Sequence, residues 1–256
     1  EKHKKSRRYA KSQDFWLKEF ENKPEINIFP VTENSIDYSS SEINGKISAE
    51  LFSKVKALCD ANEISPASFF NAVNATYIHK RFDIENFTIG VPVFNRTTPE
   101  ELNTIGLYMH LVPLVIDLKN DSFIENARRI ENSQMNLFRH QSFTQQDIKS
   151  LLAENNIQAN QLFDMVSDFQ EFTKNDEYEM RIIYGNALSV PVEMHLQTYD
   201  EDKYNLKIRY KKAIFTEQDI EVMLNSIIAL TENALLTPDK NICEIGKERI
   251  RRAGKK

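Results

Sequence analysis

Two short apolar runs in the middle of the chain predict a pair of buried strands. Residues 87–94 (FTIGVPVF) and 107–116 (LYMHLVPLVI) are rich in β-branched and aromatic residues, and the polar residues 95–101 (NRTTPEE) separate them. Runs of this length between turn residues are typical of strands covered on both faces, although periodicity alone also allows a buried helix. Pro92 and Pro113 disfavour the helix, because each would remove an intrahelical hydrogen bond and clash with the preceding turn.

Apolar positions at helical spacing predict helices before and after this pair. Ser48 is a candidate cap for one of them, and Ser65 followed by Pro66 is the favoured start of another. Ser122 and Glu125 have the spacing of a capping box, in which each side chain bonds the backbone amide of the other residue. The predicted helices cover residues 8–20, 48–59, 66–78, 122–138 and 144–152, and a final one begins near residue 216.

Alternation of apolar and polar residues predicts further strands in the second half of the chain. Residues 162–169 fit one strand, and residues 181–184 fit a second. Residues 192–199 and 204–210 predict an antiparallel hairpin with one apolar and one polar face, half open to solvent or covering a channel. On the polar face, His195 is expected to be exposed to solvent.

The order of these elements predicts the fold class. Strands and helices are mixed and do not strictly alternate, which indicates an α/β protein with a mixed-sheet, two-layer sandwich. Residues 26–41 have no period and are expected to form an extended connection. There is no internal repeat, and no linker rich in Gly, Pro or Ser divides the chain.

Composition narrows the function classes. The 256 residues are 41% hydrophobic and 28% charged, which is ordinary for a soluble domain with a sizeable core. A formal net charge of -5 argues against general nucleic-acid binding, and the basic residues at the two ends are expected to be solvated tails. Two cysteines, no apolar run that could span a bilayer and no signal peptide predict a cytoplasmic protein. No glycine-rich phosphate loop supports nucleotide binding.

Few residue patterns point to chemistry. The five histidines are all isolated in the sequence: His3, His79, His110, His140 and His195. Asp164 and Asp168 would share one face of a strand, but no His or Cys joins them in the sequence, so a metal site is disfavoured. No Gly-x-Ser-x-Gly elbow supports covalent catalysis.

The central apolar segment resembles a known family. IGVPVFNR (89–96), followed by NTIGLYMHLVPLVI (103–116), is similar to the C-terminal half of a condensation domain of nonribosomal peptide synthetases. That family has a Gly-x-Pro-x-x-x-Arg segment and then an Ile-Gly-x-Phe-x-Asn segment that leads into a strand. RRYAKSQDFWLKEF (7–20), HQSF (140–143) and QLFDMVSDFQ (161–170) also occur in the expected order.

The resemblance implies half of a two-lobed acyl-transfer enzyme with a chloramphenicol-acetyltransferase-like fold. The family's His-His-x-x-x-Asp-Gly motif is absent, since no two histidines are adjacent, so no catalytic residue is expected in this chain. Residues 1–24 would be a linker helix from the missing N-terminal lobe, residues 25–246 the C-terminal lobe and residues 247–256 a basic tail.

The resemblance also implies partners. The parent enzyme would join aminoacyl or peptidyl thioesters that hang on the phosphopantetheine arms of carrier domains, beside other synthetase domains. This lobe would supply tunnel wall and support, and it would be inactive alone. A noncatalytic module that binds carrier proteins and a stand-alone acyltransferase of the same fold are the alternatives.

Particular residues take roles from the resemblance. Arg96 would pair with the Asp of the missing motif and support it; a solvent-facing turn residue is the alternative. The residues expected along the substrate tunnel are Asn95, Gly106, Tyr108, His110 and Gln170.

Two of the remaining predictions concern histidines. His110 stands where the family has Asn, and a buried structural histidine is the alternative there. His140 and Phe143 would belong to a carrier-docking surface, with Phe143 as an exposed contact. A helix-terminal histidine, favoured as a cation by the helix dipole, is the alternative for His140.

Overall fold

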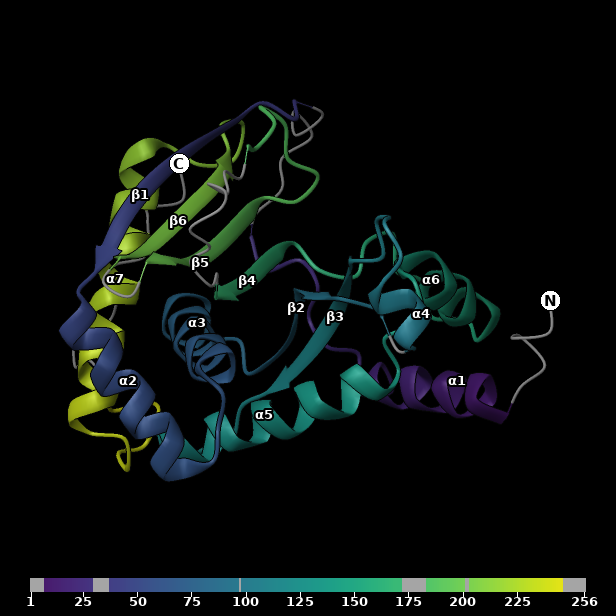
Figure 1. Cartoon of the computed structure of the whole chain (residues 1–256), viewed down its shortest axis with the longest axis horizontal. Coiled ribbons are helices and arrows are strands. Elements are labelled where there is room, and N and C mark those ends of the chain that lie inside the picture. Colours follow the sequence, from purple (N-terminus) through teal and green to yellow (C-terminus); the bar gives the residue numbers. More distant parts are fainter. Residues whose placement is uncertain (1–6, 30–36, 97, 172–182, 201–202, 246–256) are drawn as a thin grey trace.

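The computed structural model describes residues 7–29, 37–96, 98–171, 183–200 and 203–245. Within these ranges, six strands form one mixed sheet in the order β1-β6-β5-β4-β2-β3 (Figure 1). The strands are β1 (Ser40–Ile47), β2 (Asn86–Val93), β3 (His110–Asp117), β4 (Met165–Glu171), β5 (Val192–Asp200) and β6 (Lys203–Lys211). The helices are α1 (Arg7–Glu19), α2 (Ala49–Asn62), α3 (Pro66–Phe82), α4 (Pro99–Leu102), α5 (Phe123–Arg139), α6 (Gln145–Glu154) and α7 (Glu217–Leu236).

The predicted helix starts are confirmed, with one change in the detail. Ser48 and Ser65 cap α2 and α3, and Ser122 accepts a hydrogen bond from the amide of Glu125 at the start of α5. The Glu125 side chain does not complete the capping box; it bonds Arg128, and the Ser122 amide donates to Asp121. The neighbouring Asp121 carboxylate therefore bonds the Ser122 amide, and the Arg128 guanidinium one turn away bonds the Glu125 carboxylate, in place of the capping-box contact between Ser122 and Glu125.

The central strand pair forms as predicted, and its composition explains its geometry. β2 and β3 pair antiparallel from Asn86 opposite Asp117 to Val93 opposite His110. At Gly90, a Cβ atom would lie 2.5 Å from the ring of Phe163, so only glycine permits this close approach. β3 begins at His110, later than predicted, because residues 107–109 belong to the preceding loop.

The rest of the sheet combines a predicted hairpin with an unpredicted edge strand. β5 and β6 pair antiparallel as predicted, β4 pairs parallel to β5, and a single parallel pair joins Gly90 of β2 to Val166 of β4. β1 pairs with β6 along its whole length but was not predicted, because its residues are mostly polar and its partner is distant in the sequence. The predicted strand at 181–184 lies partly outside the described residues, and residues 183 and 184 are not in a strand.

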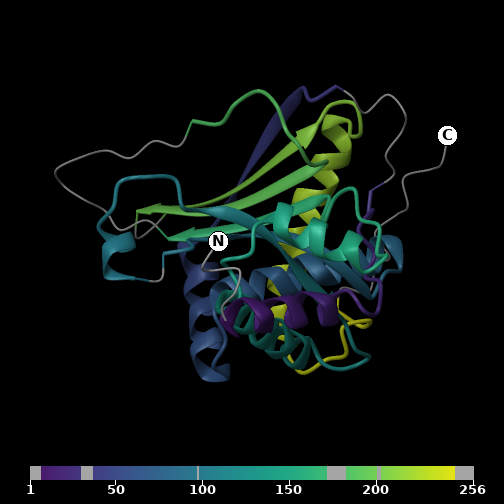
Figure 2. The ribbon, with the colours of Figure 1, turned by 90° about the vertical axis from the view of Figure 1, so that its right-hand side faces the viewer.

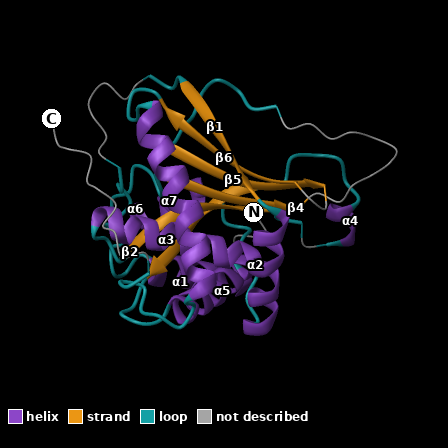
Figure 3. Cartoon of the chain, turned by 90° about the vertical axis from the view of Figure 1, so that its left-hand side faces the viewer, coloured by secondary structure: helices purple, strands orange, loops and turns teal. Residues whose placement is uncertain are grey.

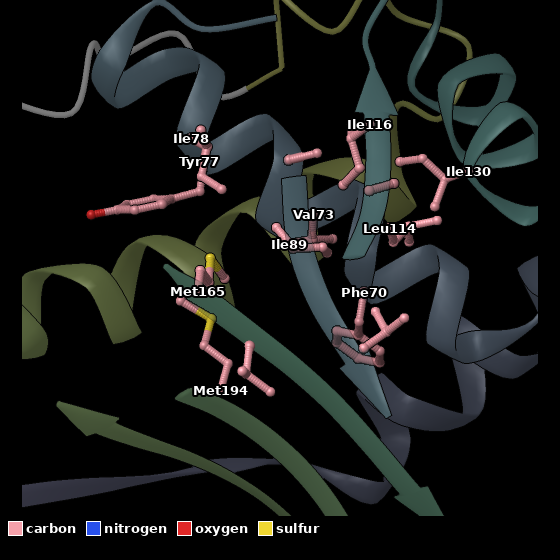
Figure 4. Packing of buried hydrophobic residues seen from close by; sticks show 14 of the residues in the cluster. Phe70, Val73, Tyr77, Ile78, Ile89, Leu114, Ile116, Ile130, Met165 and Met194 are labelled. Carbon is pink, nitrogen blue, oxygen red and sulfur yellow. The ribbon is translucent and has the colours of Figure 1, made fainter. Parts of the chain in front are cut away.

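One side of the sheet packs against the helices (Figures 2 and 3). Phe70 and Val73 of α3 lie close to Ile89 of β2, and Met165 and Met194 lie side by side on β4 and β5 (Figure 4). All of these side chains are buried, so the core lies between the sheet and helices α2, α3, α5 and α7. The predicted mixed α/β class is confirmed.

A buried polar network fixes the position of α3 against the sheet. Ser167 of β4 donates to Asn71 (2.7 Å) and accepts from Asn74 (3.1 Å), and Asn71 donates to Gln134 of α5 (2.9 Å). Because every buried amide here has a partner, the network specifies one register of α3 without leaving an unsatisfied group.

Asp164, just before β4, is a buried carboxyl that holds the segment after α1. Its Oδ2 accepts a hydrogen bond from the amide of Phe29 (2.9 Å), whereas its Oδ1 has no partner among the described residues. Burial raises the pKa of Asp164 to about 7, and the bonds from backbone amides only partly oppose this. The carboxyl therefore keeps its proton under conditions in which an exposed aspartate has lost it.

We predict that the free energy of unfolding falls as the pH rises from the pKa that Asp164 has in the unfolded chain to the higher pKa that it has in the folded protein. Since the folded pKa lies above the unfolded one, the free energy of unfolding should fall by up to about 4 kcal/mol between about pH 4 and pH 7. Urea unfolding at several pH values measures this slope. Asp164→Asn should flatten it, whereas Asp60→Asn, at an exposed position on α2, should not; an unchanged slope in Asp164→Asn contradicts the prediction.

Candidate functional site

Arg96 organises the loop between β2 and β3. Its guanidinium donates to the carbonyl oxygens of Glu101, Thr104 (2.7 Å) and Gly106 (3.0 Å). It also stacks on the ring of Tyr108, 4.2 Å from the centroid. The planar guanidinium carries several donors in fixed directions, so it can bond carbonyl oxygens that have no partner in a strand or a long helix. The Arg96 side chain therefore holds this loop closed.

The turn that follows α5 holds both ends of the same loop. Asn95, at the start of the loop, has the left-handed backbone angle φ of 48°, and its amide donates to the Gln141 side chain (2.8 Å). At the other end, the His110 ring nitrogen Nε2 lies 3.2 Å from the carbonyl oxygen of Phe143. Residues 140–143 therefore fix the points at which the loop leaves β2 and enters β3.

The loop presents apolar side chains to solvent. It projects beyond the helices that cover the sheet, with α4 near its tip (Figures 2 and 3). Its exposed large apolar side chains are Phe94, Leu102, Ile105, Leu107 and Met109. A cluster of this kind on a fixed loop is typical of a surface that contacts another molecule.

His140 and Phe143 face the interior of the protein. The His140 Nδ1 lies 2.9 Å from the hydroxyl of Ser12 in α1, and the imidazole stacks on Phe15 at 4.3 Å. Burial, followed by the charges of Arg139, Arg8 and Lys11, lowers the pKa of His140, so the expected stabilisation of its cation by the helix dipole does not prevail.

Phe143 is only 1% exposed and packs on the Tyr9 ring at 4.7 Å. The prediction that Phe143 is an exposed contact is wrong, because α1 covers it.

A second cluster lies on the polar face of the sheet, across β4, β5 and β6. His195 is 6% exposed; the Nδ1 of its ring lies 3.0 Å from Asp168 and its Nε2 lies 3.2 Å from Glu193. Arg209 donates to Glu193 as well (2.6 Å). The prediction that His195 is exposed is wrong, because strand pairing sets it opposite Asp168 and the segment containing Tyr184 lies over it.

The charges in this cluster support one another. Burial alone would lower the pKa of His195, but hydrogen bonds and charge from Asp168 and Glu193 raise it above its usual value. Burial would raise the pKa of Glu193, but the bonds and charges of His195 and Arg209 hold it below its usual value. A carboxylate beside each ring nitrogen favours the imidazolium form of His195, in which both nitrogens donate, so the arrangement suits an organising role for this side chain better than that of a base.

Gln170 belongs to this second cluster. Its amide donates to Asp168 (2.8 Å) and accepts from Gln197 (3.3 Å), which also donates to the Tyr184 hydroxyl (2.6 Å). Of the residues expected along a tunnel, Asn95, Gly106 and Tyr108 lie in the β2–β3 loop, His110 is the first residue of β3, and Gln170 lies apart on the sheet face. Sequence reasoning missed the cluster of Asp168, Glu193 and His195; the alternation in β5 was its only signal.

The described residues offer no metal site and no membrane span. No group of three or more His, Cys, Asp or Glu side chains among them could hold a metal ion. None of the described helices combines the length and the apolar character that crossing a bilayer requires.

Comparison with known proteins identifies relatives along nearly the whole chain. A family model described as "Condensation domain" matches residues 1–247. Surfactin synthase subunit 1 of Bacillus subtilis (strain 168) is 25% identical over 256 residues, which cover 94% of this chain and 7% of the synthase. The chain therefore corresponds to a small part of that relative.

Solved structures share the fold at low sequence identity. The first condensation domain of the calcium-dependent antibiotic synthetase, in complex with a substrate analogue, matches with a TM-score of 0.76 and 14% identity, over 95% of this chain and 55% of that one. The complex of the X-domain and OxyB from teicoplanin biosynthesis matches with a TM-score of 0.80 and 13% identity, over 99% and 57%. The predicted fold is confirmed as that of condensation-domain structures, and the chain spans little more than half of each solved chain.

We predict that Arg96→Met loosens the β2–β3 loop without unfolding the protein. Loss of a charged donor to three carbonyls should speed hydrogen exchange of amides in residues 98–108 by about tenfold or more. Exchange measured by mass spectrometry reports this directly. Arg139→Met, which removes a bond to Asn136 on the surface of α5, is the matched control, and unchanged exchange in the loop of Arg96→Met contradicts the role given to Arg96.

We predict that His195 stabilises the protein most at acidic to neutral pH. Because its folded pKa is raised, its contribution is complete below the unfolded pKa and is lost as the pH rises through the folded one. His195→Gln should cost about 2 kcal/mol near pH 6 and clearly less near pH 9, measured by urea unfolding. His79→Gln is the control; a cost in His195→Gln that does not depend on pH contradicts the prediction.

Proposed function

The chain belongs to the condensation domain family, and from this membership we propose that it is the C-terminal lobe of a condensation domain in a nonribosomal peptide synthetase. Residues 1–24, which contain α1, would lead in from an N-terminal lobe, and residues 25–246 would form the lobe itself. Residues 247–256 would be a basic tail that lies outside the described part of the chain. The match of the family model over residues 1–247 carries this proposal.

The proposed reaction forms one amide bond from two carrier-bound substrates. Each substrate is a thioester on the phosphopantetheine arm of a carrier domain. The acceptor amine attacks the donor thioester carbonyl, the donor thiol leaves and takes up the proton that the amine loses, and the product stays on the acceptor carrier. Holding the two arms in attack geometry supplies much of such a rate, so the lobe acts mainly by positioning.

The β2–β3 loop supports the proposal that a second lobe is needed. Its exposed apolar side chains, held in place by Arg96, fit a surface that another polypeptide covers. The solved relatives supply a reason to expect such a polypeptide, since this chain spans 55% and 57% of their lengths.

Arg96 would position groups in this function and would not itself react. Through the loop it sets Gly106 and Tyr108, and the resemblance adds an Asp of the other lobe as a further partner. We propose Asn95, Gly106, Tyr108, His110 and Gln170 as residues along the substrate tunnel. We propose His140 as a carrier-docking residue, but no direct carrier contact for the side chain of Phe143, which is buried beneath α1.

A noncatalytic interaction module is the second candidate function. The likeness to the X-domain, which is solved in complex with OxyB, favours it, because that structure matches this chain with a TM-score of 0.80. In this case the loop surface would bind a partner protein and no amide would form.

For either function the two cysteines, Cys59 and Cys243, are free thiols, which supports a reducing compartment such as the cytoplasm.

We predict that the isolated chain forms no amide from carriers loaded with aminoacyl thioesters. Addition of the proposed N-terminal lobe should give amide formation, which mass spectrometry of the acceptor carrier detects. Arg96→Met should lower the restored rate more than Arg139→Met does.

The control replaces the second His of the His-His-x-x-x-Asp-Gly motif in the added lobe by Ala and should give no product. Amide formation by the chain alone contradicts the lobe proposal. Carrier or partner binding without any amide in the presence of an intact upstream motif favours the interaction module instead.

A further inference from the structure

The turn that follows α7 places an exposed cysteine beside a histidine of α3. The Sγ of Cys243 lies 3.5 Å from the Nε2 of His79, a half-buried residue in the last turn of α3. The other cysteine, Cys59 on α2, is fully buried, and burial raises the pKa of its thiol to about 12. The two thiols of the chain therefore have opposite environments.

Backbone contacts hold Cys243 in this position. Its carbonyl oxygen accepts a hydrogen bond from the ammonium of Lys80, the neighbour of His79 in α3 (3.0 Å). Ile242 and Ile245, on the two sides of Cys243, are both buried and anchor the turn in the core. The contact between the thiol and the imidazole thus lies on a turn that is bonded to α3 and packed into the core.

The surroundings of the His79 ring indicate which of its nitrogens carries the proton. Its Nδ1 is enclosed and has no hydrogen-bond partner. A proton on Nδ1 would therefore bury an N–H donor without an acceptor, which is costly. A proton on Nε2 instead points at the sulfur of Cys243, so Nε2 is the donor and Sγ the acceptor.

A sulfur atom in the acceptor role favours the negatively charged thiolate. A neutral thiol accepts hydrogen bonds weakly, and cations beside a cysteine stabilise its thiolate. Burial lowers the pKa of Lys80, and the charge of Cys243 opposes this effect, so the ammonium and the thiolate stabilise each other. The thiolate is the nucleophile in cysteine chemistry, and an ordinary exposed cysteine has only a small fraction of it at neutral pH.

We propose that Cys243 is a reactive thiol that exchanges with small-molecule disulfides and so carries a reversible modification. The Cys243 thiolate attacks one sulfur of the disulfide, and its electron pair forms the new S–S bond. The second sulfur leaves with the electrons of the old S–S bond and takes up the proton that the Cys243 thiol gave to the solvent. The product is a mixed disulfide on Cys243, and the disulfide itself is the oxidant. This site does not rest on the function proposed above.

The test measures how fast dithiodipyridine labels each cysteine of the whole chain near pH 7, both in the folded protein and in urea, with mass spectrometry to assign the label. Cys243 should react about fivefold or more faster in the folded protein, because unfolding removes the donor of His79 and the charge of Lys80. Cys59 is the internal control and should react faster in urea, because unfolding exposes it. An equal or higher rate for Cys243 in urea overturns the proposal.

A variant separates the effect of His79 from that of exposure alone. His79→Leu removes the N–H donor and should slow the labelling of Cys243 about fivefold or more. Lys240→Met, which changes an exposed side chain on the same turn, is the control and should leave the rate unchanged. Labelling of Cys243 at the wild-type rate in His79→Leu overturns the proposal, and the comparison with urea decides it if this variant does not fold.

Discussion

The close approach of β2 to the segment before β4 is the constraint on which the rest of the structure depends. A single parallel pair, Gly90 with Val166, joins the β2–β3 hairpin to the strands β4, β5, β6 and β1. The ring of Phe163 occupies the space where a side chain at Gly90 would lie. α3 covers this junction and is locked to it through Ser167, so the two halves of the sheet share one core (Figure 4).

Each half of the sheet carries one distinctive group of side chains. The first half ends in the Arg96 loop, which the turn at 140–143 holds at both ends and which α1 supports through Ser12. The second half carries the charges around His195, and Lys207 and Arg209 of β6 form ion pairs with glutamates on the neighbouring strands. The two features have opposite character, since the loop presents apolar side chains to solvent whereas the sheet face buries charged ones.

Local patterns predicted the parts of the fold that local physics determines. Serine caps, the proline at the start of α3 and the alternation of β5 and β6 depend on neighbours in the sequence, and the structure has them. β1, the burial of His195 and the burial of Phe143 depend on residues far away in the chain: β6, Asp168 and α1. The resemblance predicted the family and a supporting role for Arg96, but the bonds from Arg96 to the carbonyl oxygens of its own loop depend on how the loop folds back, which the sequence pattern does not show.

We propose that this chain is one lobe of a two-lobed condensation domain, and the sequence of the reading frame upstream of Glu1 tests this proposal. An N-terminal lobe with an intact His-His-x-x-x-Asp-Gly motif, whose Asp can meet Arg96, is expected there. A frame that begins near Glu1, or one that carries a broken motif, would contradict the claim and leave the β2–β3 loop as the surface of an interaction module.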